Sequence, residues 1–89
     1  MHITIEKLND TRFKVTVTSR TTTTHTVTLS PDYKQKLTGG KVPAEKLIEK
    51  SFEFLLEREP QTNILKTFDL PEIQRYFPDY EHTIRTLLK

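Results

Sequence analysis

The residues of this chain that could carry metal or acid–base chemistry are few and widely separated. Its three histidines stand at positions 2, 25 and 82, with no spacing typical of metal ligands. His25 lies in the run TSRTTTTHTVTLS, where hydroxyl groups surround a single imidazole. Such a ring could act as a base or a ligand, but alternation along the run groups it with Val27 and Leu29 on the inner face of a strand. We therefore predict a structural histidine at the margin of the core and no metal site.

Three other patterns bear on chemistry. Glu49, Glu53 and Glu57 recur every four residues, which places them in one row on the polar side of a helix, where carboxylates are solvated. Gly39-Gly40 precedes Lys41 but lacks the GxxxxGK[ST] pattern of a phosphate-binding loop. The lack of cysteine excludes disulfides, thiolate zinc sites, iron–sulfur clusters and cysteine nucleophiles. We predict no catalytic, cofactor-binding or metal-binding residue, and hence a protein that is not an enzyme.

The N-terminal third of the chain has the period of a β-strand. Apolar residues at every second position predict a three-stranded antiparallel meander over about residues 2–30. Threonine is β-branched and favours a pleated sheet, and here it occupies the opposite parity, which we expect to face solvent. The inward residues are Ile3, Ile5, Phe13, Val15, Val17, His25, Val27 and Leu29, with Leu8 as a further candidate, and the outward threonines are Thr4, Thr16, Thr18, Thr24, Thr26 and Thr28.

A helical pattern replaces the alternation after Ser30. Ser30 and Pro31 are typical of a helix start, and Gly39 of a helix end. Pro43 and Pro60 bracket the longest apolar run, whose inward arc spans about 200° at 100° per residue. An arc this wide predicts a helix that is covered by the sheet on one side and by the C-terminal segment on the other.

The C-terminal segment is divided by prolines into short helices. Asp69 and Glu72 have the spacing of a capping box, and the last helix groups Tyr80 and Ile84 with Leu87 and Leu88 on its inward side. We predict helices over about residues 31–38, 43–58, 62–68, 70–76 and 79–88, packed on one face of the sheet. The chain of 89 residues is thus predicted to form one α+β domain, residues 1–89.

The run EKSFEFLLEREPQTNILKTFDLPEIQRYFPDYE, from Glu49 to Glu81, resembles a family of small bacterial proteins. These share a phenylalanine-rich helix, an REP break and an FDLP…YFPDYE tail, and the upstream THTVTLS and LTGGKV segments fit the same pattern. The family has no established activity. The resemblance therefore implies a bacterial α+β domain and transfers no functional residue.

The favoured function is a non-enzymatic module for protein interaction or self-association. A short antiparallel sheet leaves edge strands with unpaired backbone groups, which could pair across a two-fold axis to form a homodimer. Tyr76, Phe77 and Tyr80 cluster around Pro78 and form a candidate partner surface, although aromatic residues at these spacings also fit ordinary core packing. The protein partner is not identified by these patterns.

The alternative function is nucleic-acid binding. The segment NILKTFDLPEIQRYF has a degenerate helix-turn-helix pattern, with Gln74 and Arg75 as candidate contacts on its second helix. Lys14 and Arg20 offer a second route across the sheet. The net charge of +2 is low for a nucleic-acid binder, and no exposed aromatic residues alternate with the basic ones. We expect nucleic acid not to be the partner, and the lack of a signal peptide or an apolar span predicts a cytoplasmic protein without membrane contact.

Overall fold

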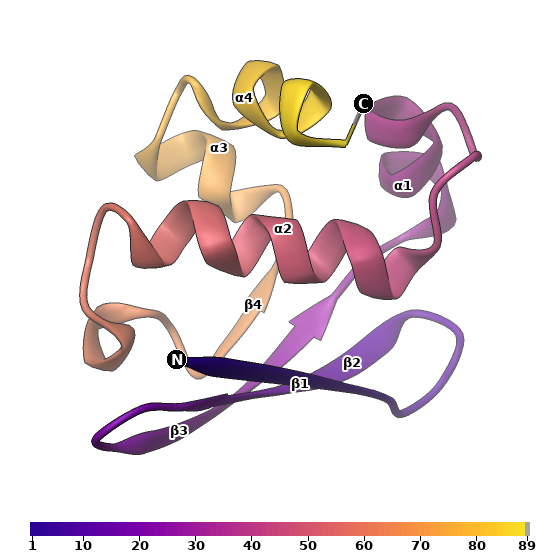
Figure 1. Cartoon of the computed structure of the whole chain (residues 1–89). Coiled ribbons are helices and arrows are strands. Elements are labelled where there is room, and N and C mark those ends of the chain that lie inside the picture. The colour runs from indigo at the N-terminus through magenta and orange to yellow at the C-terminus, as the bar shows by residue number, and fades with distance from the viewer. Residues whose placement is uncertain (89) are drawn as a thin grey trace.

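A computed structural model describes residues 1–88 and has an α+β architecture, as predicted. A sheet and a layer of helices enclose one core (Figure 1). The strands are β1 (His2–Lys7), β2 (Arg12–Thr18), β3 (Thr22–Thr28) and β4 (Thr67–Asp69). The helices are α1 (Pro31–Thr38), α2 (Ala44–Leu56), α3 (Glu72–Tyr76) and α4 (Tyr80–Leu87), with a 3₁₀ helix, η1 (Gln61–Asn63), after α2.

The sheet has four strands in the order β1-β2-β3-β4, and the first three form the predicted antiparallel meander. The prediction of a helix over residues 62–68 is wrong. This segment forms η1 and then β4, which runs parallel to β3 with Val27 opposite Phe68. The reason is long-range pairing: the amide of Thr26 donates to the carbonyl of Lys66 at 2.7 Å, and the amide of Leu70 donates to the carbonyl of Thr28 at 2.9 Å. These bonds satisfy backbone groups of β3 that a helix over 62–68 would leave unpaired.

The two faces of the sheet differ as the alternation predicts. The inner face buries Phe13, Val15, Val17, His25 and Val27. The outer face carries threonines that are directly opposite one another across the strands, including Thr4 with Thr16 and Thr16 with Thr24. β-Branched side chains in such cross-strand rows stabilise a sheet on its solvent side. Leu8 lies in the turn after β1 and is exposed, so it is not an inward residue.

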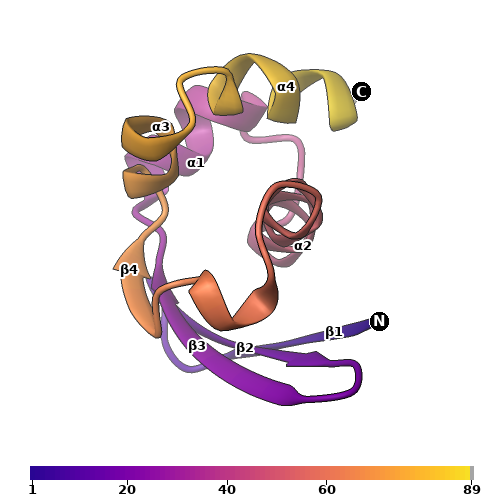
Figure 2. The same ribbon diagram turned by 90° about the vertical axis from the view of Figure 1, so that its left-hand side faces the viewer.

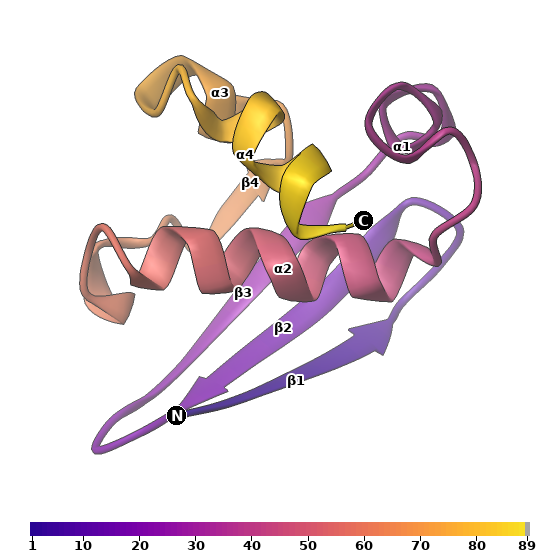
Figure 3. The same ribbon diagram turned by 45° about the horizontal axis from the view of Figure 1, so that its top comes forward.

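Helix α2 lies between the sheet and the C-terminal helices, as the width of its apolar arc predicts. Figure 2 shows α2 end-on within the curve of the sheet, and Figure 3 shows it crossing the strands diagonally. Phe52 packs against the rings of His25 and Phe68 on the sheet side. Phe54, two residues and about 200° further round the helix, packs against Phe77 and Tyr80. The helix therefore has apolar neighbours on two opposite sides.

Helix α1 has the ends that its sequence predicts. The Ser30 hydroxyl oxygen accepts the amide hydrogen of Tyr33 at 3.2 Å, and Gly39 adopts a left-handed φ of 68° that favours glycine. The Tyr33 hydroxyl donates to the Glu81 carboxylate at 2.8 Å, which ties α1 to α4. Burial, reinforced by this hydrogen bond, raises the pKa of Tyr33 above its ordinary value.

Candidate functional site

The three aromatic residues of the predicted partner surface do not lie together on the surface. Tyr76 is 67% exposed and Phe77 is half-buried, but Tyr80 is 0% exposed. Tyr80 is buried because it faces α2, where its hydroxyl lies 2.6 Å from the Ser51 hydroxyl. Ser51 uses its own hydrogen to donate to the Leu47 carbonyl at 2.7 Å, so Tyr80 is the donor to Ser51. Tyr80 is therefore a core residue, and the prediction that it forms part of a partner surface is wrong.

Tyr76 and Phe77 instead line an open apolar groove of about 370 Å³, which we call the β4 groove. It lies where the C-terminal end of α2, η1, β4 and α3 meet. Its floor is formed by Leu55, Ile64, Phe68, Ile73 and Phe77, and its rim by Glu59, Asn63, Leu65, Glu72 and Tyr76. Leu65 is 47% exposed at the rim. The floor is itself buried, with Leu55, Ile64, Phe68 and Ile73 each at most 5% exposed, so the apolar surface that meets solvent belongs mainly to the rim residues Leu65 and Tyr76.

His25 holds one wall of the β4 groove in place. Its Nδ1 lies 2.8 Å from the Leu65 carbonyl oxygen and its Nε2 lies 2.9 Å from the Thr23 hydroxyl oxygen. A carbonyl only accepts, so Nδ1 carries the hydrogen, and in the neutral ring Nε2 then accepts from Thr23. Both ring nitrogens are therefore engaged within the fold. His25 is 1% exposed, and its position on the inner face agrees with the structural role predicted for it.

Gln61 holds the adjoining 3₁₀ helix and is a residue that sequence reasoning missed. Its side-chain amide nitrogen lies 3.1 Å from the Val17 carbonyl, 3.0 Å from the Thr21 carbonyl and 3.1 Å from the Thr23 hydroxyl. The amide is buried against the turn between β2 and β3. A buried glutamine that meets these backbone acceptors fixes η1 to the sheet, and no local pattern in the sequence predicts it.

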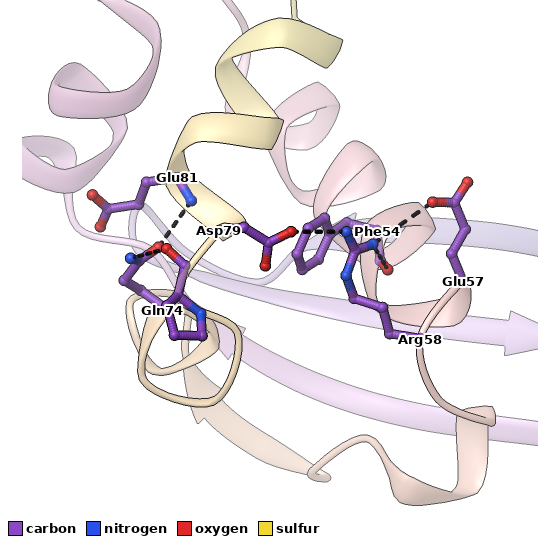
Figure 4. A network of polar contacts seen from close by, with 7 residues as sticks. Phe54, Glu57, Arg58, Gln74, Asp79 and Glu81 are labelled. Atoms are coloured by element: carbon purple, nitrogen blue, oxygen red, sulfur yellow. Dashed lines mark hydrogen bonds and ion pairs between the residues drawn. The ribbon is translucent and has the colours of Figure 1, made fainter.

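A network of polar contacts joins the C-terminal end of α2, α3 and the start of α4 (Figure 4). The Arg58 guanidinium donates to the Phe54 carbonyl at 3.1 Å and to the Asp79 carboxylate at 3.0 Å, and it stacks over the Phe54 ring with its carbon 3.5 Å from the ring centroid. Gln74 donates to the Pro78 carbonyl at 2.6 Å and accepts the Glu81 amide hydrogen at 2.9 Å. The arrangement fixes the turn that follows α3.

Two carboxylates flank the apolar floor of the groove. Glu72 accepts the backbone amide of Asp69 at 2.8 Å, which is one half of the predicted capping box. Partial burial raises the pKa of Glu59 above its ordinary value. Within residues 1–88 no ion pair involves either Glu59 or Glu72, and Arg58, which precedes Glu59 in the chain, pairs with Glu57 and Asp79. The rim therefore carries two carboxylates that form no ion pair in the part of the chain that the structure describes.

A second hollow lies between β1 and α2. Its lining includes Ile3 and Leu56 together with Glu49, Glu53 and Glu57, the acidic row seen in the sequence. Glu53 pairs with Lys50 at 3.4 Å, and Glu57 pairs with Arg58 at 3.7 Å. The row is a partly solvated helix edge beside the free edge of β1.

The residues proposed as nucleic-acid contacts are not gathered at one place. Lys14 lies on the outer face of the sheet, opposite Glu6 and Thr26, and Arg20 lies in the turn after β2. Gln74 and Arg75 lie in α3, on the helical side, and the Gln74 amide is already occupied by the fold. A helix-turn-helix is not formed, because its predicted first helix is replaced by η1 and β4. The expectation that nucleic acid is not the partner stays a prediction.

The structure is thus that of an α+β protein with a mixed four-stranded sheet and an apolar groove beside its edge strand β4. No group of three or more His, Cys, Asp or Glu side chains within residues 1–88 is arranged to hold a metal ion. None of the helices in this part of the chain combines the length and the hydropathy that a membrane span requires.

Comparison of the chain with protein-family models, with curated proteins and with solved structures finds no significant match. These comparisons leave the resemblance to small bacterial proteins as an expectation.

Proposed function

We propose that the protein is a non-enzymatic interaction module that binds a segment of a partner protein in the β4 groove. The observation that carries this proposal is the exposure of apolar rim residues, 47% for Leu65 and 67% for Tyr76, over a floor that belongs to the core. Apolar anchors in concave, largely desolvated pockets supply most of the affinity of protein interfaces. A groove that opens along its rim suits the side chain of an incoming segment, whereas sites for small molecules enclose most of the ligand surface.

A partner other than a second copy of this chain is favoured by charge. A two-fold interface brings the same patch of both copies together. Pairing through β1 would bring together the acidic rows of two copies, in which Glu53 and Glu57 are paired with Lys50 and Arg58 but Glu49 forms no ion pair within residues 1–88. Pairing through the groove would do the same for Glu59 and Glu72. Like charges across an interface oppose association. We therefore favour a different protein over a second copy of this chain as the partner.

Selection from a displayed library of linear random peptides tests the proposal. Leu65→Ser removes an apolar rim side chain and keeps the backbone carbonyl that His25 contacts. Leu87→Ser is the matched control, because Leu87 is 43% exposed and lies on α4, outside the groove. We expect peptides that bind the wild type and the Leu87→Ser variant but not the Leu65→Ser variant.

Failure to enrich any such peptide, or enrichment of peptides that bind all three proteins equally, would contradict the groove as the binding site. Native mass spectrometry of the same samples reports the subunit number. A homodimer that the Leu65→Ser variant disrupts would show that a second copy occupies the groove, and it would overturn the proposal of a different partner.

A further inference from the structure

β4 has a free edge next to the groove. The carbonyl of Lys66 and the amide of Leu70 point to β3, and the period of two along a strand then directs the backbone groups of Thr67 and Asp69 to the other side. The Asp69 amide is satisfied by the Glu72 carboxylate at 2.8 Å. The amide and carbonyl of Thr67 and the carbonyl of Asp69 remain directed at the open edge. Such groups are a template for the pairing of one more strand.

The groove lies on the side of the sheet to which a new strand would direct its inward side chains. Phe68 points inward from β4 and forms part of the groove floor. A strand paired with β4 places its own inward side chain beside Phe68, about 5 Å away across the ladder. Because Phe68 lines the groove, that position adjoins the groove. Backbone pairing and burial of an apolar anchor are thus available to the same segment.

The negative charge of the groove rim favours basic residues close to the apolar side chain of the added strand. Glu59 and Glu72 flank the apolar floor, and within residues 1–88 neither forms an ion pair. Side chains two residues apart on a strand point to the same face. A lysine or arginine two positions from the anchor therefore lies on the groove side, where the carboxylates are. The raised pKa of Glu59 reflects lost solvation, which a cation would compensate.

We propose that the occupant of the β4 groove is an extended segment of a partner protein that adds a strand to the free edge of β4. Its apolar side chain fills the groove, and a lysine or arginine two residues away, on the same face, meets Glu59 and Glu72. This mode of recognition is β-strand addition, in which the backbone supplies affinity and alternate side chains supply specificity. The inference rests on the proposed function, because it specifies the partner of that same groove.

Three synthetic peptides test the inference. TKTLTKT places its two lysines on the same face as its leucine, KTTLTTK has the same composition but places them on the opposite face, and TETLTET reverses the charge. We expect TKTLTKT to bind about tenfold more tightly than either of the others at low salt. The Glu59→Gln/Glu72→Gln double variant, which keeps a hydrogen-bond acceptor for the Asp69 amide, should remove this preference, whereas the exposed Glu45→Gln control should retain it.

Hydrogen exchange of the Thr67 amide separates strand addition from other modes of binding. Because this amide points away from β3, a paired strand should slow its exchange about tenfold or more, and a TKTLTKT peptide that is N-methylated on its backbone should not. Absence of binding by TKTLTKT, equal binding of all three peptides, or an unchanged Thr67 amide while groove residues respond would overturn the inference. Library peptides that depend on Leu65 but lack a lysine or arginine near an apolar residue would also overturn it, and would leave the proposed function standing.

Discussion

The imidazole Nδ1 of His25 lies 2.8 Å from the carbonyl oxygen of Leu65, which is 40 residues further along the chain. This hydrogen bond joins the inner face of β3 to the segment that precedes β4, and it fixes the backbone of the residue whose side chain forms the groove rim. The histidine among threonines is therefore a connection between the meander and the groove. The bond links β3, whose sequence alternates regularly, to the segment before β4, a strand that the sequence pattern does not predict.

His25→Leu should destabilise the protein by about 1–3 kcal/mol, because the Leu65 carbonyl and the Thr23 hydroxyl lose their partner in a partly buried position. Urea unfolding followed by circular dichroism measures this loss. Thr24→Ala, at the neighbouring outward position, serves as the control and should change the free energy of unfolding by far less. Equal stability of His25→Leu and wild type would contradict the structural role of the ring, as would a loss of bound metal in His25→Ala.

The assignment of the two sheet faces predicts a clear order of stability among three variants. Phe52→Ala and Val15→Ala remove side chains that are fully buried and should each cost about 2–5 kcal/mol. Thr26→Ala shortens a partly exposed side chain on the outer face and should cost much less. Chemical denaturation of the three variants tests the order, and a Thr26→Ala variant that was the least stable would show the faces to be reversed.

Stability should fall in alkaline solution. Burial raises the pKa of Tyr33 and of Tyr80 above the ordinary value of 10.0, so above this pH the unfolded chain loses phenol protons that the folded chain retains. The folded state then binds more protons, and the free energy of unfolding decreases as the pH rises above 10.0; below it both states are protonated and the phenols contribute no pH dependence.

Tyr33→Phe isolates this effect. It removes the hydrogen bond to Glu81 and should cost about 1 kcal/mol at neutral pH, but its stability should fall less steeply in alkali. Urea midpoints measured from neutral pH to about pH 11 distinguish the two behaviours. An identical alkaline slope in wild type and Tyr33→Phe would mean that this phenol does not resist ionisation in the folded state.

The elements that the sequence predicts well are those set by local pattern. The alternation at Phe13, Val15 and Val17 and the cap residues Ser30 and Gly39 depend on neighbours a few residues away, and the structure contains them as expected. The spacing of Tyr80 and Ile84 predicts that both are buried, and both are. The helical spacing of Tyr80 thus predicts its location correctly, whereas its closeness in sequence to Tyr76 and Pro78 does not. Leu87, grouped with the same inward side, is instead 43% exposed near the end of α4.

The β4 strand and its groove could not be predicted because both depend on distant partners. Apolar residues at positions 64, 65 and 68 have helical spacing, yet pairing with β3 and the bond from His25 to Leu65 hold the segment extended. The groove is lined by residues between Leu55 and Phe77, which only the folding of α2, η1, β4 and α3 brings together. Neither condition can be read from the residues that form the groove.

The affinity of a library-selected peptide for the wild type and for Leu65→Ser, measured side by side by calorimetry, tests the central claim most directly. The β4 groove as a protein-binding site predicts that Leu65→Ser weakens binding at least about tenfold, or about 1.4 kcal/mol, while Leu87→Ser leaves it unchanged. Equal affinities for wild type and Leu65→Ser would place the binding surface elsewhere on the molecule and contradict the claim.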